Sequence, residues 1–591
     1  MYPVLRRFRS RVLIATLFLL VFALFSSWSH LSAQTDDPEQ PDPSDPTLTD
    51  AMRRFLENRE EVEVPERMGA TPCVAGTAGP YPCNNVDLMT FMPVSDFSAS
   101  YTNDMWGWTD PLDGKEYVLL GVSNGTVFVD ISDPVNPLYL GKLPTETSSS
   151  PWRDIKVYNN YAFIVSEAGG HGMQIFDLTE LRSVVSPPVT FSNTDHYNGF
   201  GSAHNIAINE DSGYAYGLGT GTCSGGLHMV DIQDPLNATN AGCYSSDGYT
   251  HDAECVIYSG PDADYTGAEV CFNSNEDTLT IVDVTNKAAP ALISRTGYTG
   301  SDYTHQGWLM DGQRYFLLGD EGDEFTFGHN TRTYIWDLVD LDNPAAIGSY
   351  TGPNASVDHN MYVVNNFVYQ SNYSSGLQIL DLSDVGNANL TQAAYFDTYT
   401  PNNNASYNGS WSNYPFYDSG IVAASGIDEG LFILKPTIDM AILESDQDEI
   451  EETVTVGETV TRTLTVSNTG NISFTFTVSE GAAWAAVSPS GGTLDPGQAT
   501  ALSVVFDSSA TAGAGTYTDA LSFSGTFNNS PADVDLILHV QEPADYSSYL
   551  PVVVGDGGAN AAGSTAGALS WLFPLLGLTA AAEIGRRKHS Q

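Results

Sequence analysis

A short apolar stretch that ends in aspartate recurs seven times between residues 127 and 435 of this chain. The first copy, Val-Phe-Val-Asp at 127–130, is followed by a turn rich in aspartate, asparagine and proline. The repeated position is filled in turn by Asp130, Asp177, Asp231, Asp283, Asp337, Asp381 and, in a degenerate last copy, Lys435. Copies spaced roughly 50 residues apart are the signature of a repeat architecture. We interpret the aspartate itself as a turn residue whose carboxylate accepts backbone N–H groups.

Each repeat contains four short segments with the pattern of β-strands. In the copy at 154–178, Asn159 and Asn160 form a hairpin turn between the first two segments, and a Gly-rich loop at 167–172 precedes the third. The fourth follows the Asp/Pro turn, as at 138–142 in the first copy. Four strands repeated seven times, without a long helical period, predict an all-β fold, a seven-bladed β-propeller. A parallel β-helix competes, but its rungs are shorter than this repeat.

The repeat also resembles a known family. The pattern of apolar residues, Val-Asp-Ile/Leu, then Asp-Pro and Asn-Pro at 127–137 resembles the LVIVD repeat of bacterial surface proteins. The whole stretch 73–436 is similar to the repeat region of the choice-of-anchor B family, and it covers well over half of the chain. The resemblance implies an exported protein displayed at the cell surface, and it supplies no ligand.

A second domain is expected at 437–542. Segments that alternate apolar and polar residues are separated there by Gly- and Pro-rich turns, and about seven short strands in about 100 residues predict an immunoglobulin-like β-sandwich. The run from Trp484 to Gly497 is similar to BACON and related bacterial Ig-like domains. Carbohydrate binding has been inferred for some members of those families. We interpret Trp484 as a core residue and the module as a spacer, with glycan binding as the lesser alternative.

Both ends of the chain carry targeting signals. Basic residues, an apolar run and the small-residue site at Ala33 predict a signal peptide at 1–33, with an uncleaved anchor helix as the alternative. An acidic, Pro-rich linker at 34–72 is expected to be disordered, with a short charged helix at 51–66 as the alternative for its second half. After a linker at 543–567, the apolar segment 568–591 with its basic tail predicts a membrane anchor, or a transmembrane or sorting segment that is later removed.

The charge balance excludes one class of partner. The 591 residues include 22 Lys and Arg against 72 Asp and Glu, a formal net charge of −50. Such a chain does not suit nucleic acid, whose phosphates need a basic surface. It suits cation-rich surroundings or bound divalent cations, and the alternative is a solvated acidic surface that keeps the protein soluble.

The even number of cysteines suggests disulfides in an exported chain. Pairing sequence neighbours would join Cys73 to Cys83, Cys223 to Cys243 and Cys255 to Cys271, although the sequence does not fix this connectivity. No C-x-x-C pair is present, so the spacing does not suggest a zinc site built from cysteines.

Histidine recurs where the first strand of a repeat begins. Four consecutive repeats place His204, His251, His305 and His359 there, and the second repeat has Arg153. In the first and last copies the position is assigned to Trp106 and Ser412. Because the first strand of a propeller blade is innermost, we expect these side chains to ring one mouth of the central channel.

Further polar residues are expected on the same face, and together they form a ligand face of Arg153, Glu167, His171, Asp252, Glu254, Asp320, Glu321 and Asp358. Imidazoles and carboxylates at one mouth could hold zinc or another transition metal, bind a polar ligand, or transfer protons. If the ring is wide, only an adjacent pair such as His251 and His305 would coordinate. The run 320–324 is similar to a calcium loop without EF-hand spacing, so calcium is a further candidate. The alternative is that each His bonds a neighbouring blade's backbone.

Catalysis has little support from motifs. The sequence contains no G-x-S-x-G elbow, no H-E-x-x-H and no P-loop, and the Gly-rich run 217–221 precedes no helix. The favoured function is a surface-anchored binding, adhesion or scaffold protein that presents this face to a protein, a glycan or a metal. The alternatives are a metal-dependent hydrolase or lyase that uses the His ring, and a purely structural surface-layer component.

Overall fold

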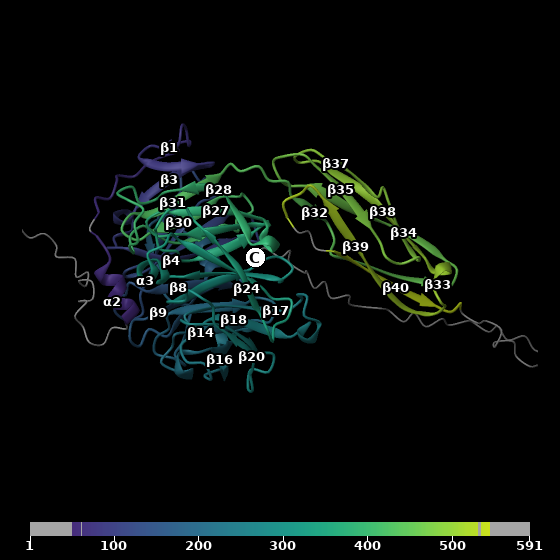
Figure 1. The fold of residues 1–591 in the computed structure, drawn as a ribbon, viewed down its shortest axis with the longest axis horizontal. Coiled ribbons are helices and arrows are strands. Elements are labelled where there is room, and N and C mark those ends of the chain that lie inside the picture. The colour runs from purple at the N-terminus through teal and green to yellow at the C-terminus, as the bar shows by residue number, and fades with distance from the viewer. Residues whose placement is uncertain (1–49, 61, 530–532, 544–591) are drawn as a thin grey trace, which may run out of the picture. The chain divides into compact units, whose positions relative to one another are not determined.

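The computed structural model describes residues 50–60, 62–529 and 533–543, and the chain divides into two compact units, Met1–Ile438 and Asp439–Gln591 (Figure 1). β-Strands are the dominant regular structure of the described residues and helices are few, which confirms the all-β prediction. Their α-helices are α2 (Asp50–Glu57) and α3 (Asp323–Phe327), and neither has the length and apolar character that a membrane span needs. The signal peptide expected at 1–33 and the anchor or sorting segment expected at 568–591 lie outside the described residues.

The described part of the first unit is built from seven sheets, and the body of six of them is an antiparallel set of four strands that follow one another closely in the chain. The first three sheets are β4 (Thr102–Thr109), β5 (Glu116–Val122), β6 (Gly125–Asp130) and β7 (Leu138–Pro144); β8 (Arg153–Tyr158), β9 (Tyr161–Ser166), β10 (Met173–Asp177) and β12 (Asp195–Tyr197); and β13 (Asn205–Asn209), β14 (Tyr214–Leu218), β15 (His228–Asp231) and β16 (Thr239–Cys243). A short β11 (Val189–Thr190) joins β7 in parallel.

The next three sheets follow the same order along the chain. They are β17 (Asp252–Ile257), β18 (Glu269–Ser274), β19 (Leu279–Asp283) and β20 (Ala291–Thr296); β21 (Thr304–Leu309), β22 (Tyr315–Asp320), β23 (Arg332–Asp337) and β24 (Ala345–Thr351); and β25 (Met361–Val364), β26 (Phe367–Ser371), β27 (Leu377–Asp384) and β28 (Asn389–Phe396). Two N-terminal strands, β1 (Thr77–Ala78) and β2 (Tyr81–Asn84), extend the edge of the last of these sheets at β28.

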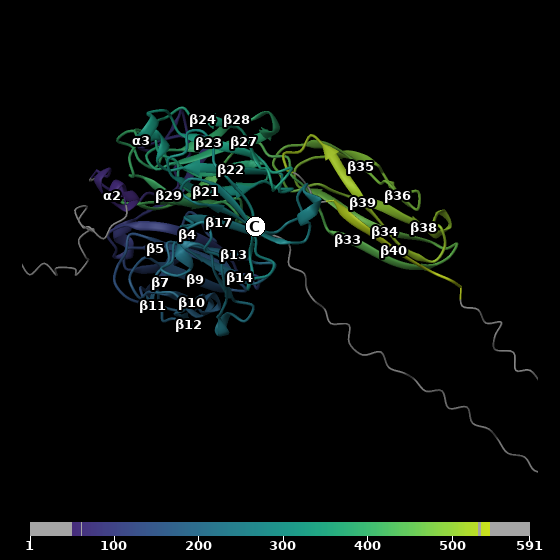
Figure 2. The same cartoon turned by 60° about the horizontal axis from the view of Figure 1, so that its bottom comes forward.

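The seventh sheet joins the two ends of the unit. It contains β29 (Ser410–Tyr414), β30 (Val422–Gly426) and β31 (Gly430–Pro436), and its fourth strand is β3 (Val86–Pro93) from the N-terminal side. Along the chain, the first strand of each sheet contacts the first strand of the next, and β29 contacts β4, so these strands form a closed ring. Figure 2 shows β4, β13, β17, β21 and β29 gathered in the interior of the unit.

The repeated aspartate has the turn role expected of it. In the first copy, the Asp130 carboxylate accepts a hydrogen bond from the backbone N–H of Ser132 at 3.0 Å. The same contact, two residues ahead in the chain, recurs at Asp177, Asp231, Asp283, Asp337 and Asp381. In the first five copies the aspartate is also the last residue of the third strand, so it starts the turn that follows, whereas β27 continues past Asp381 to Asp384.

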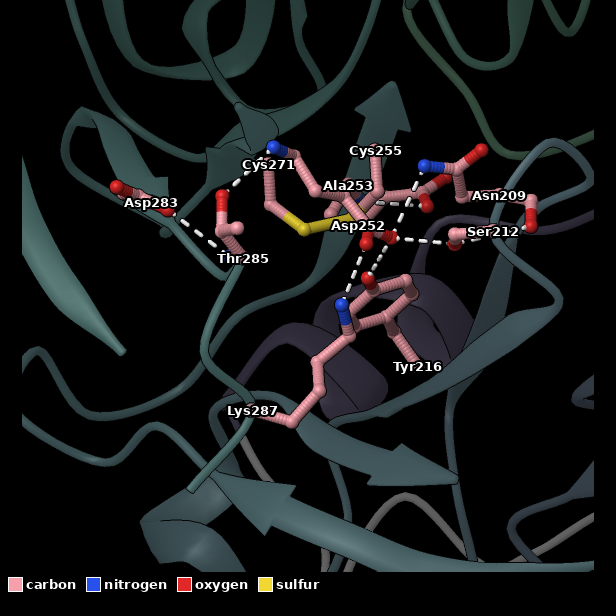
Figure 3. Close-up of a disulfide and its surroundings, with 11 residues drawn as sticks. Asn209, Ser212, Tyr216, Asp252, Ala253, Cys255, Cys271, Asp283, Thr285 and Lys287 are labelled. Carbon is pink, nitrogen blue, oxygen red and sulfur yellow. Dashed lines mark hydrogen bonds and ion pairs between the residues drawn. A yellow bond between two sulfur atoms is a disulfide. The ribbon is translucent and has the colours of Figure 1, made fainter. Parts of the chain in front are cut away.

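Apolar side chains from neighbouring sheets pack against each other. Phe128 of β6 and Phe176 of β10, for example, stack at 4.8 Å between ring centroids in a fully buried cluster that joins the first two sheets. Two adjacent sheets are also joined by polar contacts, because Asn209, Ser212, Tyr216 and Lys287 all donate to the buried carboxylate of Glu269 (Figure 3). These contacts fix neighbouring sheets face to face.

Three disulfides join the cysteines that are neighbours in sequence: Cys73–Cys83, Cys223–Cys243 and Cys255–Cys271. The last pair joins facing residues of β17 and β18, as Figure 3 shows. The prediction of disulfides is confirmed.

The described part of the N-terminal linker is ordered and not disordered, and its helix overlaps the stretch 51–66 where a short charged helix is the alternative prediction. Residues 50–57 of the segment 34–72 form α2, and Met68 and Thr71 form β-bridges to β3. Leu56 is buried in an apolar cluster, and Arg54 forms an ion pair with Asp302 at 2.6 Å. Tertiary contacts of this kind order a short polar helix that local sequence would not hold.

The second unit is a two-sheet sandwich. One sheet contains β32 (Leu443–Ser445), β34 (Thr459–Asn468), β38 (Ala499–Asp507) and β36 (Ala485–Ser488). The other contains β33 (Glu449–Thr455), β40 (Val534–Gln541), β39 (Gly515–Gly525), β35 (Phe474–Ser479) and β37 (Gly491–Leu494). Buried residues alternate with exposed ones along β35, as expected of a half-buried strand. Trp484 is buried in the core against Phe506, which confirms its interpretation as a core residue.

Candidate metal and ligand site

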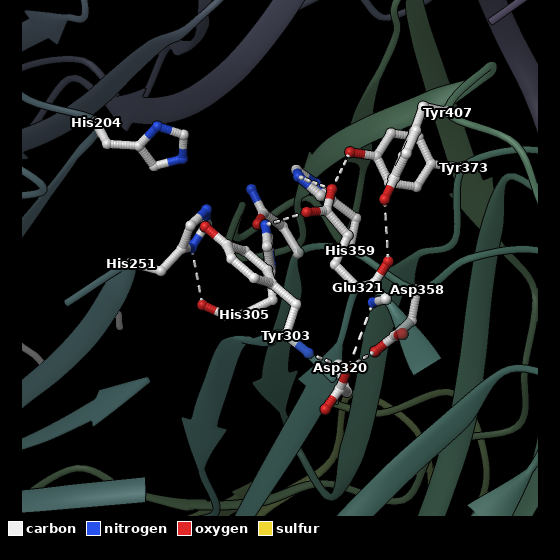
Figure 4. Close-up of polar contacts among 12 residues, drawn as sticks. His204, His251, Tyr303, His305, Asp320, Glu321, Asp358, His359, Tyr373 and Tyr407 are labelled. Carbon is white, nitrogen blue, oxygen red and sulfur yellow. Dashed lines mark hydrogen bonds and ion pairs between the residues drawn. The ribbon is translucent and has the colours of Figure 1, made fainter. Parts of the chain in front are cut away.

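Four imidazoles form one continuous row along the ring of first strands (Figure 4). The ring centroids of His204 and His251 are 4.3 Å apart, those of His251 and His305 are 4.0 Å apart, and those of His305 and His359 are 4.4 Å apart. We call these residues the histidine row. Each lies within two residues of the start of the first strand in its sheet, so the repeat itself places the side chains side by side.

The row ends differently from the sequence-based assignment. Trp411, and not Ser412, continues it, with its ring 4.9 Å from that of His359. Strand β29 has a β-bulge at Trp411, where its pairing register shifts between Ser410 and Ser412. Strand β21 has the same kind of bulge at His305. Trp411 therefore occupies the position in its sheet that His305 occupies in the β21 sheet. Trp106 also does not belong to the row, because its ring packs against Tyr362 and Tyr414 in an apolar cluster.

A cavity of about 440 Å³ lies against the histidine row. Its walls combine imidazoles, carboxylates and aromatic rings. It is lined by Trp152, Glu167, Ser202, His204, Gly219, Thr220, Gly221, Tyr249, His251, Glu276, Tyr303, His305, Glu321, His359, Tyr373 and Trp411. Such a mixture suits a polar ligand, because the aromatic rings supply contact area and the charged groups fix its orientation.

Three of these side chains converge closely enough to hold one metal ion. His305, Glu321 and His359 each offer an atom within 4.8 Å of the other two. Both the His305 Nε2–Glu321 Oε2 distance and the His359 Nε2–Glu321 Oε1 distance are 3.7 Å. Two ligands on a tetrahedral zinc ion, with bonds of about 2.0–2.1 Å, lie about 3.4 Å apart. The observed separations are near that value.

A hydrogen bond to one ring nitrogen of His359 determines which nitrogen has a lone pair available for a metal ion. Its Nδ1 donates to the backbone carbonyl of Trp411 at 2.5 Å, since a carbonyl oxygen only accepts. In the neutral imidazole, Nε2 therefore carries a lone pair, and this atom faces Glu321. A backbone acceptor on the other ring nitrogen is the usual support of a metal-binding histidine. A carboxylate facing a lone pair is unfavourable without a cation between them.

Burial sets the protonation states that metal binding needs. It lowers the pKa of His359 to about 3 and the pKa of His305 and His251 well below the usual value, so these rings are neutral at pH 7. Burial raises the pKa of Glu321 to about 7, although Tyr373 donates to its Oε1 at 2.5 Å and lowers it. Neutral imidazoles are the form that binds metal.

The other members of the row have different partners. Burial opposes protonation of His204, but Nδ1 lies 2.6 Å from Glu167 Oε1, and this hydrogen bond and nearby carboxylates raise its pKa. His251 donates from Nδ1 to the backbone carbonyl of His305 at 2.9 Å, the kind of ring-closing bond that the alternative interpretation expected. The pair that converges on a carboxylate is thus His305 and His359, rather than His251 and His305.

The structure places only part of the predicted ligand face at the cavity. Of its members, Glu167 and Glu321 line the cavity and the other six do not. Arg153 and His171 are buried and contact each other at 3.0 Å. The Asp252 carboxylate accepts a hydrogen bond from the backbone N–H of Ala253, and the Glu254 carboxylate accepts one from the backbone N–H of Leu309.

The last two members are Asp320, at the end of β22, and Asp358, in the segment before β25. Asp320 accepts from the backbone N–H groups of Asp302 and Tyr303, and Asp358 accepts from that of Asp320. All six residues outside the cavity thus have structural partners in the fold.

Several lining residues were missed by sequence reasoning. Tyr249 and Tyr303 each lie two residues before a row histidine, in the repeated tripeptide Tyr-Thr-His. This repetition was a usable signal. Tyr373 and Glu276 come from loops of unequal length after the second strands, and nothing in their spacing points to the cavity.

Comparison with known proteins supports both kinds of module. The LVIVD repeat model matches residues 115–145, 152–177 and 271–296, and a model of HYDIN/CFA65/VesB-like Ig-like domains matches residues 441–540. These matches confirm the predicted LVIVD repeats and Ig-like domain. They do not extend to the choice-of-anchor B or BACON families. No curated protein matches the chain.

Three solved structures are distantly similar to parts of this chain. A PapD-like (ASH) domain of human CEP192 is 18% identical, with 18% of this chain and 89% of that chain covered and a TM-score of 0.16. A protein from Lactobacillus plantarum is 11% identical, with 51% and 84% covered and a TM-score of 0.38. The extracellular domain of a putative one-component system from B. thetaiotaomicron is 13% identical, with 77% and 59% covered and a TM-score of 0.36.

Proposed function

We propose that this chain is an exported surface protein whose LVIVD repeats form a seven-bladed β-propeller with a transition-metal site at the mouth of its central channel. The closed ring of first strands and the pairing of β3 with β31 support the propeller. Three disulfides support folding in an oxidising compartment outside the cytosol. The family resemblance and the apolar segment 568–591 support a membrane tether of the choice-of-anchor B kind.

One observation carries the metal site: two neutral, buried imidazoles direct their Nε2 atoms at the two oxygens of one partly buried carboxylate, that of Glu321. Mixed nitrogen and oxygen donors favour zinc or a neighbouring transition metal over magnesium or calcium. Three protein ligands would leave a coordination position that faces the cavity. The ion would neutralise Glu321, whose carboxylate is otherwise held among neutral rings.

The role that fits this arrangement is binding. A polar group of another molecule would complete the coordination of the metal, while the rings of Trp152, Trp411 and Tyr303 supply flat surfaces for stacking. A glycan or a side chain of another surface protein has this chemistry, and the second, Ig-like unit would serve as a spacer.

The first test compares metal binding in matched variants. The full-length protein is stripped with chelator, dialysed and titrated with zinc in a calorimeter, and its metal content is measured by ICP mass spectrometry. We expect near-stoichiometric zinc in the wild type, and its loss in His359→Gln and Glu321→Gln. His204→Gln is the matched control, because it removes an imidazole of the same row that does not contact Glu321. Zinc that is retained in His359→Gln, or lost equally in His204→Gln, would refute the site.

A further inference from the structure

A second group of carboxylates, outside the cavity lining, joins two neighbouring sheets. Asp323 and Glu324 begin α3 in the connection between β22 and β23, and Asp358 precedes β25 of the next sheet. One oxygen from each of the three lies within 4.8 Å of the other two. Their side chains are almost fully enclosed, with exposed fractions of 0%, 3% and 1%. Figure 4 shows Asp358 on the side of Asp320 and Glu321.

Four carboxylate oxygens in this group have no hydrogen-bond partner among the described residues: Asp323 Oδ1, Asp358 Oδ1 and both oxygens of Glu324. The remaining two are satisfied, since Tyr334 donates to Asp323 Oδ2 at 2.8 Å and the backbone N–H of Asp320 donates to Asp358 Oδ2 at 3.1 Å. Hydrogen bonds from Tyr334 and from the backbone of Asp320 thus hold one side of the group, and they do not reach the oxygens of Glu324. A buried carboxylate without a partner is strongly unfavourable.

Nearby cationic side chains do not neutralise these buried carboxylates. Within the described residues, no Lys or Arg forms an ion pair with any of the three carboxylates. Arg332 of β23 lowers the pKa of Asp323 only from a distance. His329 Nε2 lies 3.5 Å from Asp323 Oδ2, the oxygen that already has a partner. A bound cation or shared protons must therefore compensate the free oxygens.

We propose that Asp323, Glu324 and Asp358 bind a calcium ion that fastens the β22–β23 connection to the segment before β25. All donors are carboxylate oxygens, the ligands of hard cations, in contrast to the nitrogen donors of the histidine row. Calcium accepts six to eight oxygens and both monodentate and bidentate carboxylates. The ion would steady the loop that carries Glu321, but the site stands on separate residues and does not rest on the proposed function.

Terbium, which replaces calcium at oxygen sites, tests this directly. The Tyr334 hydroxyl lies 2.8 Å from Asp323, so tyrosine excitation should sensitise the luminescence of an ion bound there. We expect saturable luminescence in the chelator-treated full-length protein, its displacement by calcium, and a rise in the thermal midpoint on adding calcium. Glu324→Gln should weaken terbium binding by more than about tenfold, the loss expected when a residue that only supports a metal ligand is replaced. Zinc binding at the histidine row should be retained.

The matched control is Asp342→Asn. Asp342 belongs to the exposed group Asp262, Asp340 and Asp342, whose oxygens are equally close together, and its loss should leave terbium affinity unchanged. Asp358→Asn is made in parallel in case Glu324→Gln does not fold. A wild type without saturable luminescence and without calcium-dependent stabilisation would overturn the proposal, because shared protons would then satisfy the group. Preference for magnesium over calcium, or unchanged affinity in the folded variants, would overturn it as well.

Discussion

Buried carboxyl groups give this protein a stability that depends on pH. Glu254 in β17 is buried, and its Oε2 accepts a hydrogen bond from the backbone N–H of Leu309 at 2.6 Å. Burial raises the pKa of this carboxyl to about 8. In the unfolded chain the group titrates near pH 4.3–4.5. Between these two values the folded state holds a proton that the unfolded state has lost, so the free energy of unfolding falls as pH rises.

Replacing Glu254 with glutamine should remove this contribution. The amide is neutral at every pH and its oxygen still accepts from Leu309, so we expect the fall in stability between pH 5 and 8 to become shallower, by up to about 1.4 kcal/mol per pH unit. Urea denaturation at several pH values measures the slope. The exposed Glu63→Gln is the control and should change nothing. An unaltered slope in Glu254→Gln would show that the group is ionised in the folded protein.

At the scale of elements, the closing strand β3 joins two distant parts of the chain. Its Phe91 is fully buried, with its ring 4.6 Å from that of Phe432 in β31 and 6.1 Å from that of Tyr81. Apolar packing therefore reinforces the backbone pairing that completes the seventh sheet.

Phe91→Ala should destabilise the first unit by about 3–5 kcal/mol, because it removes a large buried ring and leaves a cavity. The free energy of unfolding from guanidinium denaturation checks this. Phe327→Ala, at a phenylalanine whose surface is 51% exposed, should cost much less. Equal losses in the two variants would mean that β3 does not hold the sheet closed.

The elements were largely predictable from the sequence, because strand length, turn residues and the recurring aspartate all follow one period. Counting residues from repeat to repeat placed the four histidines correctly along the first strands. It failed at Trp411, since a bulge shifts the register by one residue without leaving a mark in the sequence. The partner of the histidines was harder to identify. Glu321 was one of many acidic candidates, and only the three-dimensional course of its loop separates it from Asp320.

At the scale of the whole molecule, each unit has a core of its own. The sandwich core is formed by side chains of the second unit alone, including Leu464, Leu502 and Leu536, all fully buried. A core that is complete within one segment is what independent folding requires.

The fragment 439–543 should therefore fold without the repeats and show one cooperative thermal transition. Circular dichroism and calorimetry of the isolated fragment measure this. Leu502→Ala within the fragment should lower its midpoint, because a buried leucine is lost. A fragment without a cooperative transition would mean that the repeats are needed for its fold.

The central claim is that one transition-metal ion binds between His305, His359 and Glu321, and its most direct test is anomalous X-ray diffraction at the zinc edge from crystals grown with zinc. The account predicts a single strong peak about 2.0–2.2 Å from Nε2 of both histidines and from the Glu321 carboxylate, at the edge of the cavity. A peak held by other groups, or none at the histidine row in a crystal saturated with zinc, would contradict it.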